Sequence, residues 1–126
     1  MGRITKNTLC KGVILFMATT PDRGDLVYLD FNPQAGHEQA GHRPAIVLTP
    51  VTFNQLTGFA WVCPVTNQKK GYPFEVELPT GLPITGVILT DQMKSLDWKA
   101  RRLSVRGTAP QEVIDDCLVL VNAILN

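Results

Sequence analysis

The side chains best suited to chemistry are concentrated in one short stretch of the chain. Gly36–Pro44 reads Gly-His-Glu-Gln-Ala-Gly-His-Arg-Pro and contains an acid, an amide, two imidazoles and a guanidinium. A guanidinium binds phosphate oxygens in pairs and stays charged at any working pH, whereas carboxylates and imidazoles can transfer protons. The set is therefore suited to a reaction at a phosphate ester. Its members are His37, Glu38, Gln39, His42 and Arg43.

Two apolar runs flank this stretch and must position it. Asp25–Phe31 and Ala45–Leu48 both have the composition of β-strands. Two glycines and the terminal Pro44 indicate that the backbone between the runs turns instead of pairing. Gly36–Pro44 is thus predicted to form the tip of a long hairpin, and loops carried by rigid strands often hold binding and catalytic groups.

The middle of the chain consists of short strand-like runs separated by turn signals. Strands at such intervals are typical of a small barrel or sandwich. Val51–Gly58 suits a helical turn or a connecting loop, and Pro64 indicates an edge or a bulge in its strand. The predicted strands are Leu26–Phe31, Ala45–Thr49, Phe59–Thr66, Phe74–Leu78, Val87–Thr90 and Leu103–Arg106.

The last segment has a different period. Apolar residues recur at helical spacing from Val113 to Leu125, and Thr108–Gln111 offers a capping box. We predict a helix from about Pro110 to Leu125 that packs its apolar face on the β-structure. The residues alone therefore predict a mainly β domain with one C-terminal helix.

Composition excludes several classes of protein. A chain of 126 residues with 44% apolar and 18% charged residues is expected to fold as one ordered domain. Its net charge of +1 is too small for a protein that coats nucleic acid by charge alone. The segment from Lys94 to Arg106 carries five cations against Asp97, so it is either a local basic face or a solvated strand and turn.

The three cysteines do not indicate a metal site or a disulfide framework. Cys10, Cys63 and Cys117 lie far apart and lack Cys-x-x-Cys spacing. Cys63 and Cys117 have apolar neighbours and are expected to be small buried hydrophobes, not nucleophiles. Reduced thiols fit a cytoplasmic protein best, and neither a metal nor another cofactor is expected.

The first twenty residues are predicted to be an N-terminal extension outside the core. The apolar run Val13–Ala18 follows three cations and imitates a signal peptide, but it lacks a small-x-small cleavage site. It is also far shorter than the ~20 residues that span a bilayer. We therefore divide the chain into an extension, residues 1–20, and one domain, residues 21–126. An upstream start, with Met17 as the natural first residue, would explain the extension.

Several motifs in order resemble the MazF/PemK/Kid family of bacterial toxins. The resemblance covers about residues 21–126 and is strongest to the MazF branch. It rests on Arg23-Gly24-Asp25-Leu26-Val27, on the run from Gly36 to Ala45, on Pro64-Val65-Thr66 and on Lys70-Gly71-Tyr72-Pro73-Phe74.

The resemblance implies a fold, an activity and partners. The fold would be a small SH3-like barrel of the MazF/PemK/CcdB type, assembled as a homodimer. The activity would be metal-independent cleavage of single-stranded RNA at a short sequence, which leaves a 2′,3′-cyclic phosphate and a 5′-hydroxyl and inhibits translation and growth. A MazE-like antitoxin with an acidic, disordered C-terminal segment would hold the toxin silent.

The resemblance also ranks the catalytic candidates. Arg43 matches the essential arginine of the family and would stabilise the phosphorane, although by itself it could form a loop salt bridge to Glu38. Thr66 matches the family threonine and would donate a hydrogen bond to a phosphoryl oxygen. Glu38 is either a general base or a group that positions Arg43. The two histidines are a direct alternative acid and base pair.

The remaining candidates are substrate contacts. Lysines and aromatic rings can grip phosphates and splayed bases, and the family has an Asp-Gln pair where Asp91 and Gln92 stand. The Kid branch has an active-site arginine at the position of Leu89, which disfavours a Kid-like catalytic set here. The expected substrate-binding residues are Tyr28, His37, Gln39, His42, Lys69, Lys70, Tyr72 and Gln92.

Two other functions remain open from the sequence. One is a binding toxin like the structurally related CcdB group, which poisons DNA gyrase and cuts nothing. The other is a non-catalytic RNA-binding or autoregulatory module, which would shift RNA in a gel with strong salt dependence and leave it intact.

Overall fold

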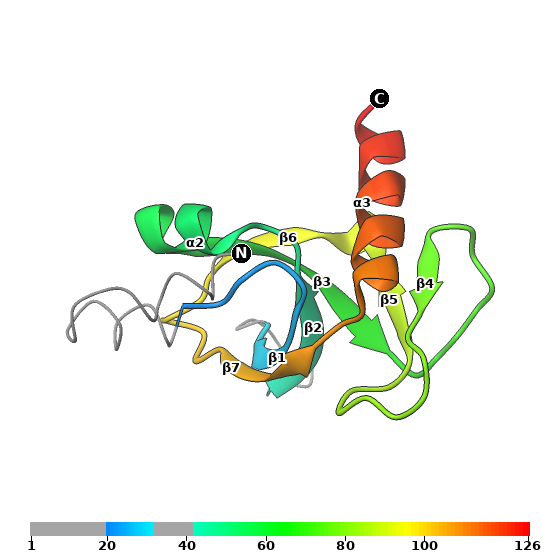
Figure 1. Cartoon of the computed structure of the whole chain (residues 1–126), viewed down its shortest axis with the longest axis horizontal. Helices are drawn as coiled ribbons and strands as arrows, with labels where there is room; N and C mark the ends of the chain where they lie inside the picture. Colours follow the sequence, from blue (N-terminus) through cyan, green and yellow to red (C-terminus); the bar gives the residue numbers. More distant parts are fainter. Residues whose placement is uncertain (1–19, 32–41) are drawn as a thin grey trace, which may run out of the picture.

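The computed structural model describes residues 20–31 and 42–126. Within these residues the chain forms seven strands, two α-helices and one 3-10 turn (Figure 1). The elements are β1 (Asp25–Asp30), β2 (His42–Val47), α2 (Val51–Thr57), β3 (Phe59–Thr66), β4 (Glu75–Glu77), β5 (Val87–Leu89), η2 (Thr90–Gln92), β6 (Lys94–Asp97), β7 (Ser104–Thr108) and α3 (Gln111–Leu125). The mainly β fold with one long C-terminal helix is confirmed.

All strand pairs are antiparallel, and the strand order is β4-β5-β3-β2-β1-β7, with β6 also paired to β3. The predicted hairpin is present, because β1 pairs with β2 from Leu26 opposite Ile46 to Asp30 opposite His42. The predicted extent of its tip is wrong at one end. His42, Arg43 and Pro44 belong to β2, since their backbone continues the pairing with β1.

Strand β3 crosses the middle of the fold and changes partner along its length (Figure 1). On one side it pairs with β2; on the other it pairs with β6 from Phe59 to Val62 and with β5 at Val65 and Thr66. Pro64 lies between the part of β3 that pairs with β6 and the part that pairs with β5. The N–H that proline lacks is therefore not needed for pairing with either strand. The strand is therefore not an edge strand, but its proline occupies a local break in pairing.

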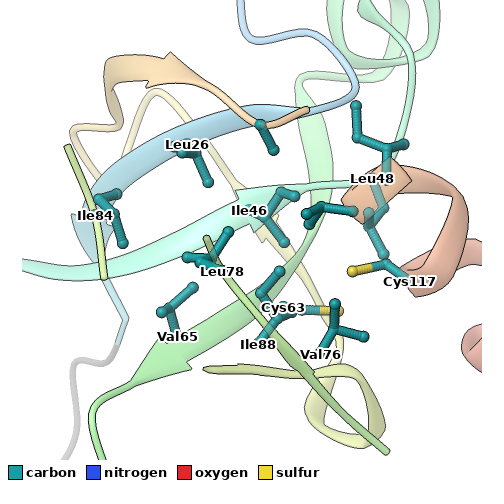
Figure 2. Packing of buried hydrophobic residues seen from close by; sticks show 13 residues of the cluster. Leu26, Ile46, Leu48, Cys63, Val65, Val76, Leu78, Ile84, Ile88 and Cys117 are labelled. Atoms are coloured by element: carbon teal, nitrogen blue, oxygen red, sulfur yellow. The ribbon is translucent and has the colours of Figure 1, made fainter. Parts of the chain in front are cut away.

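Apolar side chains cover both faces of the β1-β2-β3 sheet. Alternate residues of β2 point to opposite faces, so Ile46 joins one buried cluster while Ala45 and Val47 join the other. Figure 2 shows the first cluster, which is closed by β4, β5 and α3 and includes Cys63 and Cys117. Burial on both faces explains why the Ala45–Val47 part of β2 is continuously apolar instead of alternating.

The two described cysteines are buried in this cluster, as expected. The pKa of each thiol, Cys63 and Cys117, is raised to about 12, and burial is the main cause. Both groups are consequently neutral thiols at physiological pH. Cys10 lies outside the described residues.

The C-terminal helix begins differently from the prediction. Thr108 ends β7 opposite Asp25, and Pro110 is the N-cap of α3 without a side-chain capping bond. The capping box is therefore absent, because Thr108 is engaged in the sheet. The helix packs on the first cluster through Val113, Ile114 and Cys117, and its C-terminal end projects from the body (Figure 1).

Two segments differ from or refine the expected elements. Val51–Thr57 is an α-helix, which settles the choice between a helical turn and a loop. Strand β6 was not predicted, because Leu96 is its one buried residue and the rest of Lys94–Asp97 is exposed. The basic segment thus runs through a solvated strand and turn, where Arg101 donates hydrogen bonds to the Phe31 and Asp30 carbonyls.

The described part of the chain begins within the packed domain. Thr20 is buried and its hydroxyl donates a hydrogen bond to Gln55 at 2.7 Å, while Asn54 donates to the Pro21 carbonyl. Residues 1–19 lie outside the described part, so the proposed division between extension and domain stays a prediction. In the described residues, no helix has the length and apolarity to cross a membrane.

Candidate functional site

A pocket of about 450 Å³ lies where the ends of β2 and β3 meet the β3–β4 loop and the turn η2. Its volume is within the usual range of small-ligand sites. Its lining mixes charged, amide, hydroxyl and aromatic groups. The lining residues are Arg43, Pro44, Pro64, Val65, Thr66, Asn67, Gln68, Lys70, Tyr72, Glu75, Leu89, Asp91 and Gln92.

The pairing of β2 with β3 explains how Arg43 and Thr66 reach the same pocket. The β2–β3 ladder ends at Ala45 opposite Pro64, so Arg43 lies two residues before that pair and Thr66 two residues after it, at the same end of the two antiparallel strands. Both side chains line the pocket. Two residues far apart in the sequence therefore share one wall.

The Thr66 hydroxyl has a defined orientation. The backbone N–H of Gln68 donates a hydrogen bond to Thr66 Oγ1 at 3.1 Å. Because this bond occupies a lone pair, the hydroxyl proton remains available to an acceptor in the pocket. Gly86 packs directly against the Thr66 carbonyl with a φ of +121°, so a side chain there would displace the Thr66 backbone.

A second wall comes from the loop between β3 and β4. Lys70 and Tyr72 line the pocket from this loop, and the Lys70 ammonium lies 6.0 Å from the centre of the Tyr72 ring. Tyr72 is 58% exposed, so its ring is open to a binding partner. An exposed aromatic ring beside a cation is suited to a flat, anionic ligand such as a nucleotide.

The turn η2 closes the pocket with polar side chains. Asp91 and Gln92 line it, and both are exposed. Leu89, the last residue of β5, also lines the pocket. The position at which the resemblance expects an arginine in the Kid branch therefore belongs to the pocket wall here but contributes an apolar side chain.

The structure does not bring every expected residue to the pocket lining. Tyr28 packs on the first apolar cluster, and the Arg106 guanidinium carbon lies over the Tyr28 ring, 4.8 Å from its centre. His42 Nδ1 lies 2.7 Å from Asp30 Oδ1, which ties the start of β2 to the end of β1. Lys69 pairs with Glu77 at 2.9 Å, and this contact raises the pKa of the lysine. His37, Glu38 and Gln39 lie outside the described residues.

Three polar lining residues were not expected from the sequence. Gln68 orients Thr66, and Asn67 accepts a hydrogen bond from Thr85 at 3.2 Å. Glu75 accepts hydrogen bonds from the backbone N–H groups of Lys70 and Gly71. The sequence signal for Glu75 was misleading, because in an alternating strand it is expected to face solvent.

The described residues contain no group of three or more histidine, cysteine, aspartate or glutamate side chains placed to hold a metal ion. The functional groups that line the pocket are one guanidinium, one oriented hydroxyl, one ammonium, one exposed aromatic ring, two carboxylates and three amides.

Comparison with known proteins places these residues in a family. A family model described as a PemK-like, MazF-like toxin of type II toxin–antitoxin systems matches residues 22–125. This chain belongs to the PemK/MazF toxin family. Within that family, the endoribonuclease toxin MazF of Escherichia coli K12 is 50% identical over 107 residues, which cover 84% of this chain and 91% of the relative.

Other family members agree with this assignment. The endoribonuclease PemK of Escherichia coli is 35% identical over 108 residues, which cover 82% of this chain and 81% of the relative. The crystal structure of MazF from Deinococcus radiodurans has a TM-score of 0.77 and 49% identity, and covers 84% of this chain and 96% of that chain. A MazE–MazF complex from the same organism gives a TM-score of 0.78 with 46% identity, over the same shares of the two chains. These structural matches confirm the predicted barrel-like fold of the MazF type for this chain.

Proposed function

We propose that this family member is the toxin of a type II toxin–antitoxin system and acts as a sequence-specific, metal-independent endoribonuclease on single-stranded RNA, including mRNA. The observation that carries the proposal is the pocket that gathers Arg43 and Thr66 on one wall and Lys70 and Tyr72 on another. The name of the Escherichia coli relative, an endoribonuclease toxin at 50% identity, supports the same activity.

The proposed reaction uses the substrate's own nucleophile. The 2′-hydroxyl oxygen attacks the adjacent phosphorus and forms the new P–O bond, while the bond from phosphorus to the 5′-oxygen breaks. The 2′-proton passes to a base, and the leaving 5′-oxygen takes up a proton. The products are a 2′,3′-cyclic phosphate and a 5′-hydroxyl, and cleavage of mRNA inhibits translation and growth.

The strand wall supplies the groups that stabilise the transition state. Arg43 offers a fork of donors to the phosphoryl oxygens, whose negative charge increases as the phosphorane forms. Thr66 adds one neutral hydrogen bond, and its orientation is fixed by the Gln68 N–H. Thr66 is a poor base, so we assign it to orientation and hydrogen bonding only.

Glu38 is our candidate for the group that receives the 2′-proton, and this role stays a prediction because Glu38 lies outside the described residues. The alternative role of Glu38 is to position Arg43. The two roles differ in their effect on the pH dependence of kcat. If Glu38 is the base, its replacement should change the acidic limb of the pH profile of kcat. If Glu38 is a positioning group, its replacement should lower kcat by the same factor at every pH.

Lys70, Tyr72 and Gln92 are our candidates for gripping the RNA strand. The Lys70 ammonium would contact a phosphate, the Tyr72 ring would stack on a base, and the Gln92 amide would contact a base edge. Tyr28, His42 and Lys69 are not pocket-lining residues, so we leave them out of this set.

The decisive experiment is cleavage of a long unstructured RNA by the purified protein in excess EDTA. We expect discrete products with cyclic phosphate and 5′-hydroxyl ends, and sequencing of the 5′ ends will give the recognised sequence. Arg43→Ala and Thr66→Ala variants should fold normally and cut the RNA much more slowly, by about 10²–10³-fold for Arg43→Ala and about 10- to 100-fold for Thr66→Ala. Cleavage at an undiminished rate in both variants would contradict the site, and an RNA that is bound but never cut by the unmodified protein would indicate a non-catalytic binding module.

The proposed partner is a MazE-like antitoxin with an acidic, disordered C-terminal segment. The support is the family assignment and the MazE–MazF complexes of Deinococcus radiodurans. We also propose that the toxin is cytoplasmic, because its RNA substrate and its reduced thiols belong there.

A homodimer is the proposed assembly. In its support, the projecting end of α3 exposes Val119, Ile124 and Leu125 by 65%, 45% and 70% (Figure 1). Apolar residues exposed together on one element mark surfaces that pair with another protein. Light scattering of the purified toxin should give twice the mass of one chain, and Leu125→Asp should shift that mass toward one chain.

A further inference from the structure

The carboxylate of Glu75 holds the backbone of the β3–β4 loop in place. Glu75 Oε2 accepts a hydrogen bond from the Lys70 N–H at 3.1 Å, and Oε1 accepts one from the Gly71 N–H at 2.9 Å. The two oxygens of one side chain thus bind two successive amides, and hydrogen bonds to a charged acceptor are stronger than neutral ones.

The same residue also closes the loop through its backbone. The Glu75 N–H donates a hydrogen bond to the Tyr72 carbonyl at 3.2 Å. Glu75 therefore bonds to Lys70 and Gly71 through its side chain and to Tyr72 through its backbone. Gly71 has a φ of +78°, a conformation that residues with side chains rarely adopt. Lys70, Gly71 and Tyr72 are therefore held as one unit.

The end of the β3–β4 loop is also held by hydrogen bonds from Thr90 to the Phe74 carbonyl. Buried Thr90 donates from its hydroxyl to the Phe74 carbonyl at 2.6 Å and from its N–H at 3.2 Å. This fixes the chain directly before Glu75. Between Thr66 and Phe74, by contrast, the segment swings away from the body of the fold (Figure 1). The Glu75 carboxylate accepts from two backbone N–H groups of that outer segment, whereas Glu77 and Thr85 bond to the side chains of Lys69 and Asn67.

We infer that Glu75 is a positioning residue for substrate recognition, because its carboxylate sets the loop backbone that presents the Lys70 ammonium and the Tyr72 ring to RNA. It lines the same pocket, but as an anion it repels phosphate and is expected to act through the loop instead of touching the strand. The inference rests on the proposed function and extends it from the residues that grip RNA to the residue that organises them.

The inference separates two steps of the reaction. A preformed loop lowers the entropy cost of ordering Lys70 and Tyr72 when RNA binds. Because neither group contacts the scissile bond in this proposal, loss of the clamp should weaken binding of substrate and transition state equally. Such a loss raises KM and leaves kcat nearly unchanged.

The chain offers a matched control on the same strand. Glu77 lies two residues further along β4, is exposed, and pairs with Lys69 of the same loop at 2.9 Å. Glu77→Gln removes the same charge from the protein as Glu75→Gln, yet it leaves the backbone clamp intact. An exposed pair of this kind contributes little to stability.

The experiment measures kcat and KM for a short fluorogenic RNA that contains the site cut by the unmodified protein. Glu75→Gln should raise KM roughly tenfold, the loss expected for one charge-assisted hydrogen bond, with kcat within about twofold. Glu77→Gln should leave both constants near those of the unmodified protein. Thermal unfolding of both variants tests whether the fold is kept.

A mutant cycle tests whether Glu75 acts through these two groups. In a background that carries both Lys70→Ala and Tyr72→Ala, Glu75→Gln should change KM by less than about twofold, because both groups that it positions are already gone. An equal rise of KM in both backgrounds would overturn the inference, as would an unchanged KM for Glu75→Gln or an equal rise for Glu77→Gln. An unmodified protein that cuts no RNA would instead refute the proposed function.

Discussion

The two walls of the pocket are built from different kinds of backbone. Arg43 and Thr66 belong to strands β2 and β3, which pair with each other and rest on buried apolar clusters. Lys70 and Tyr72 belong to a loop whose residues 67–73 are all exposed and whose backbone is held by the Glu75 carboxylate. Groups that must meet a transition state need placement within a fraction of an ångström, whereas groups that bind bases can tolerate adjustment. The difference assigns chemistry to the strand wall and recognition to the loop wall.

The largest expected effect is on the strand wall, from Arg43→Ala. Loss of a well-aimed donor at a developing anion typically lowers kcat about 10²–10³-fold, and kcat/KM should fall with it. Arg43→Lys should recover little, since an ammonium cannot make the paired contact. Initial rates on the short RNA measure both.

The control for this prediction is Arg106→Ala. Arg106 is also an exposed arginine on a strand, but it stacks on Tyr28 and does not line the pocket. The loss of activity from Arg43→Ala would be uninformative about the site if Arg106→Ala lowered kcat to the same extent.

Thr66→Ala should have the next largest effect. A single hydrogen bond to a charged group contributes about 1.5–3 kcal/mol, so kcat should fall about 10- to 100-fold. Thr66→Ser keeps the hydroxyl and the acceptor for the Gln68 N–H, so it should retain most of the activity. Equal losses in the two variants would assign Thr66 a packing role and remove it from the chemistry.

Tyr72→Ala should change the loop wall alone. Stacking of one base on an aromatic ring contributes about 1–3 kcal/mol, so KM should rise about 5- to 100-fold with kcat within about twofold. Tyr72→Phe keeps the ring and should resemble the unmodified protein. A fall in kcat without a change in KM would contradict the division between the walls.

The sequence predicted the strand wall better than the loop wall, for physical reasons. Strand β3 occurs at the predicted residues Phe59–Thr66 because its residues have strong β propensity and clear stop signals. The meeting of Arg43 with Thr66 was inferred only from the family resemblance, since strand register depends on contacts between distant segments. The roles of Glu38, His37 and Gln39 stay predictions, because these residues lie outside the described part of the chain.

The loop wall depends on contacts that periodicity does not report. Alternation in Phe74–Leu78 correctly gave a strand but made Glu75 look like an ordinary solvent-facing residue. Its role becomes visible only when the path of the preceding loop is known. Lys69 and Lys70 are adjacent lysines that the sequence does not distinguish. In the structure Lys69 pairs with Glu77, whereas Lys70 lines the pocket.

The smallest expected effect on activity concerns the two thiols beneath the strand wall. Cys63 and Cys117 are buried and their thiol pKa is raised to about 12 from an ordinary value of 9.0. Iodoacetamide at neutral pH should therefore leave cleavage by a Cys10→Ser variant unchanged while the protein is folded. Rapid inactivation of this variant would contradict the burial of both thiols or indicate a functional role for one of them.

The same thiols should limit stability in alkali. Below pH 9 both folded and unfolded chains keep the thiol protons, so this contribution to the free energy of unfolding is fully present. Between about pH 9 and 12 only the unfolded chain releases them, so the free energy of unfolding should fall by about 1.4 kcal/mol per pH unit for each thiol. Urea unfolding of Cys117→Ala at several pH values measures the slope, which should be shallower than that of the unmodified protein. Equal slopes would mean that Cys117 titrates alike in both states and that the strand wall does not rest on a neutral thiol at that position.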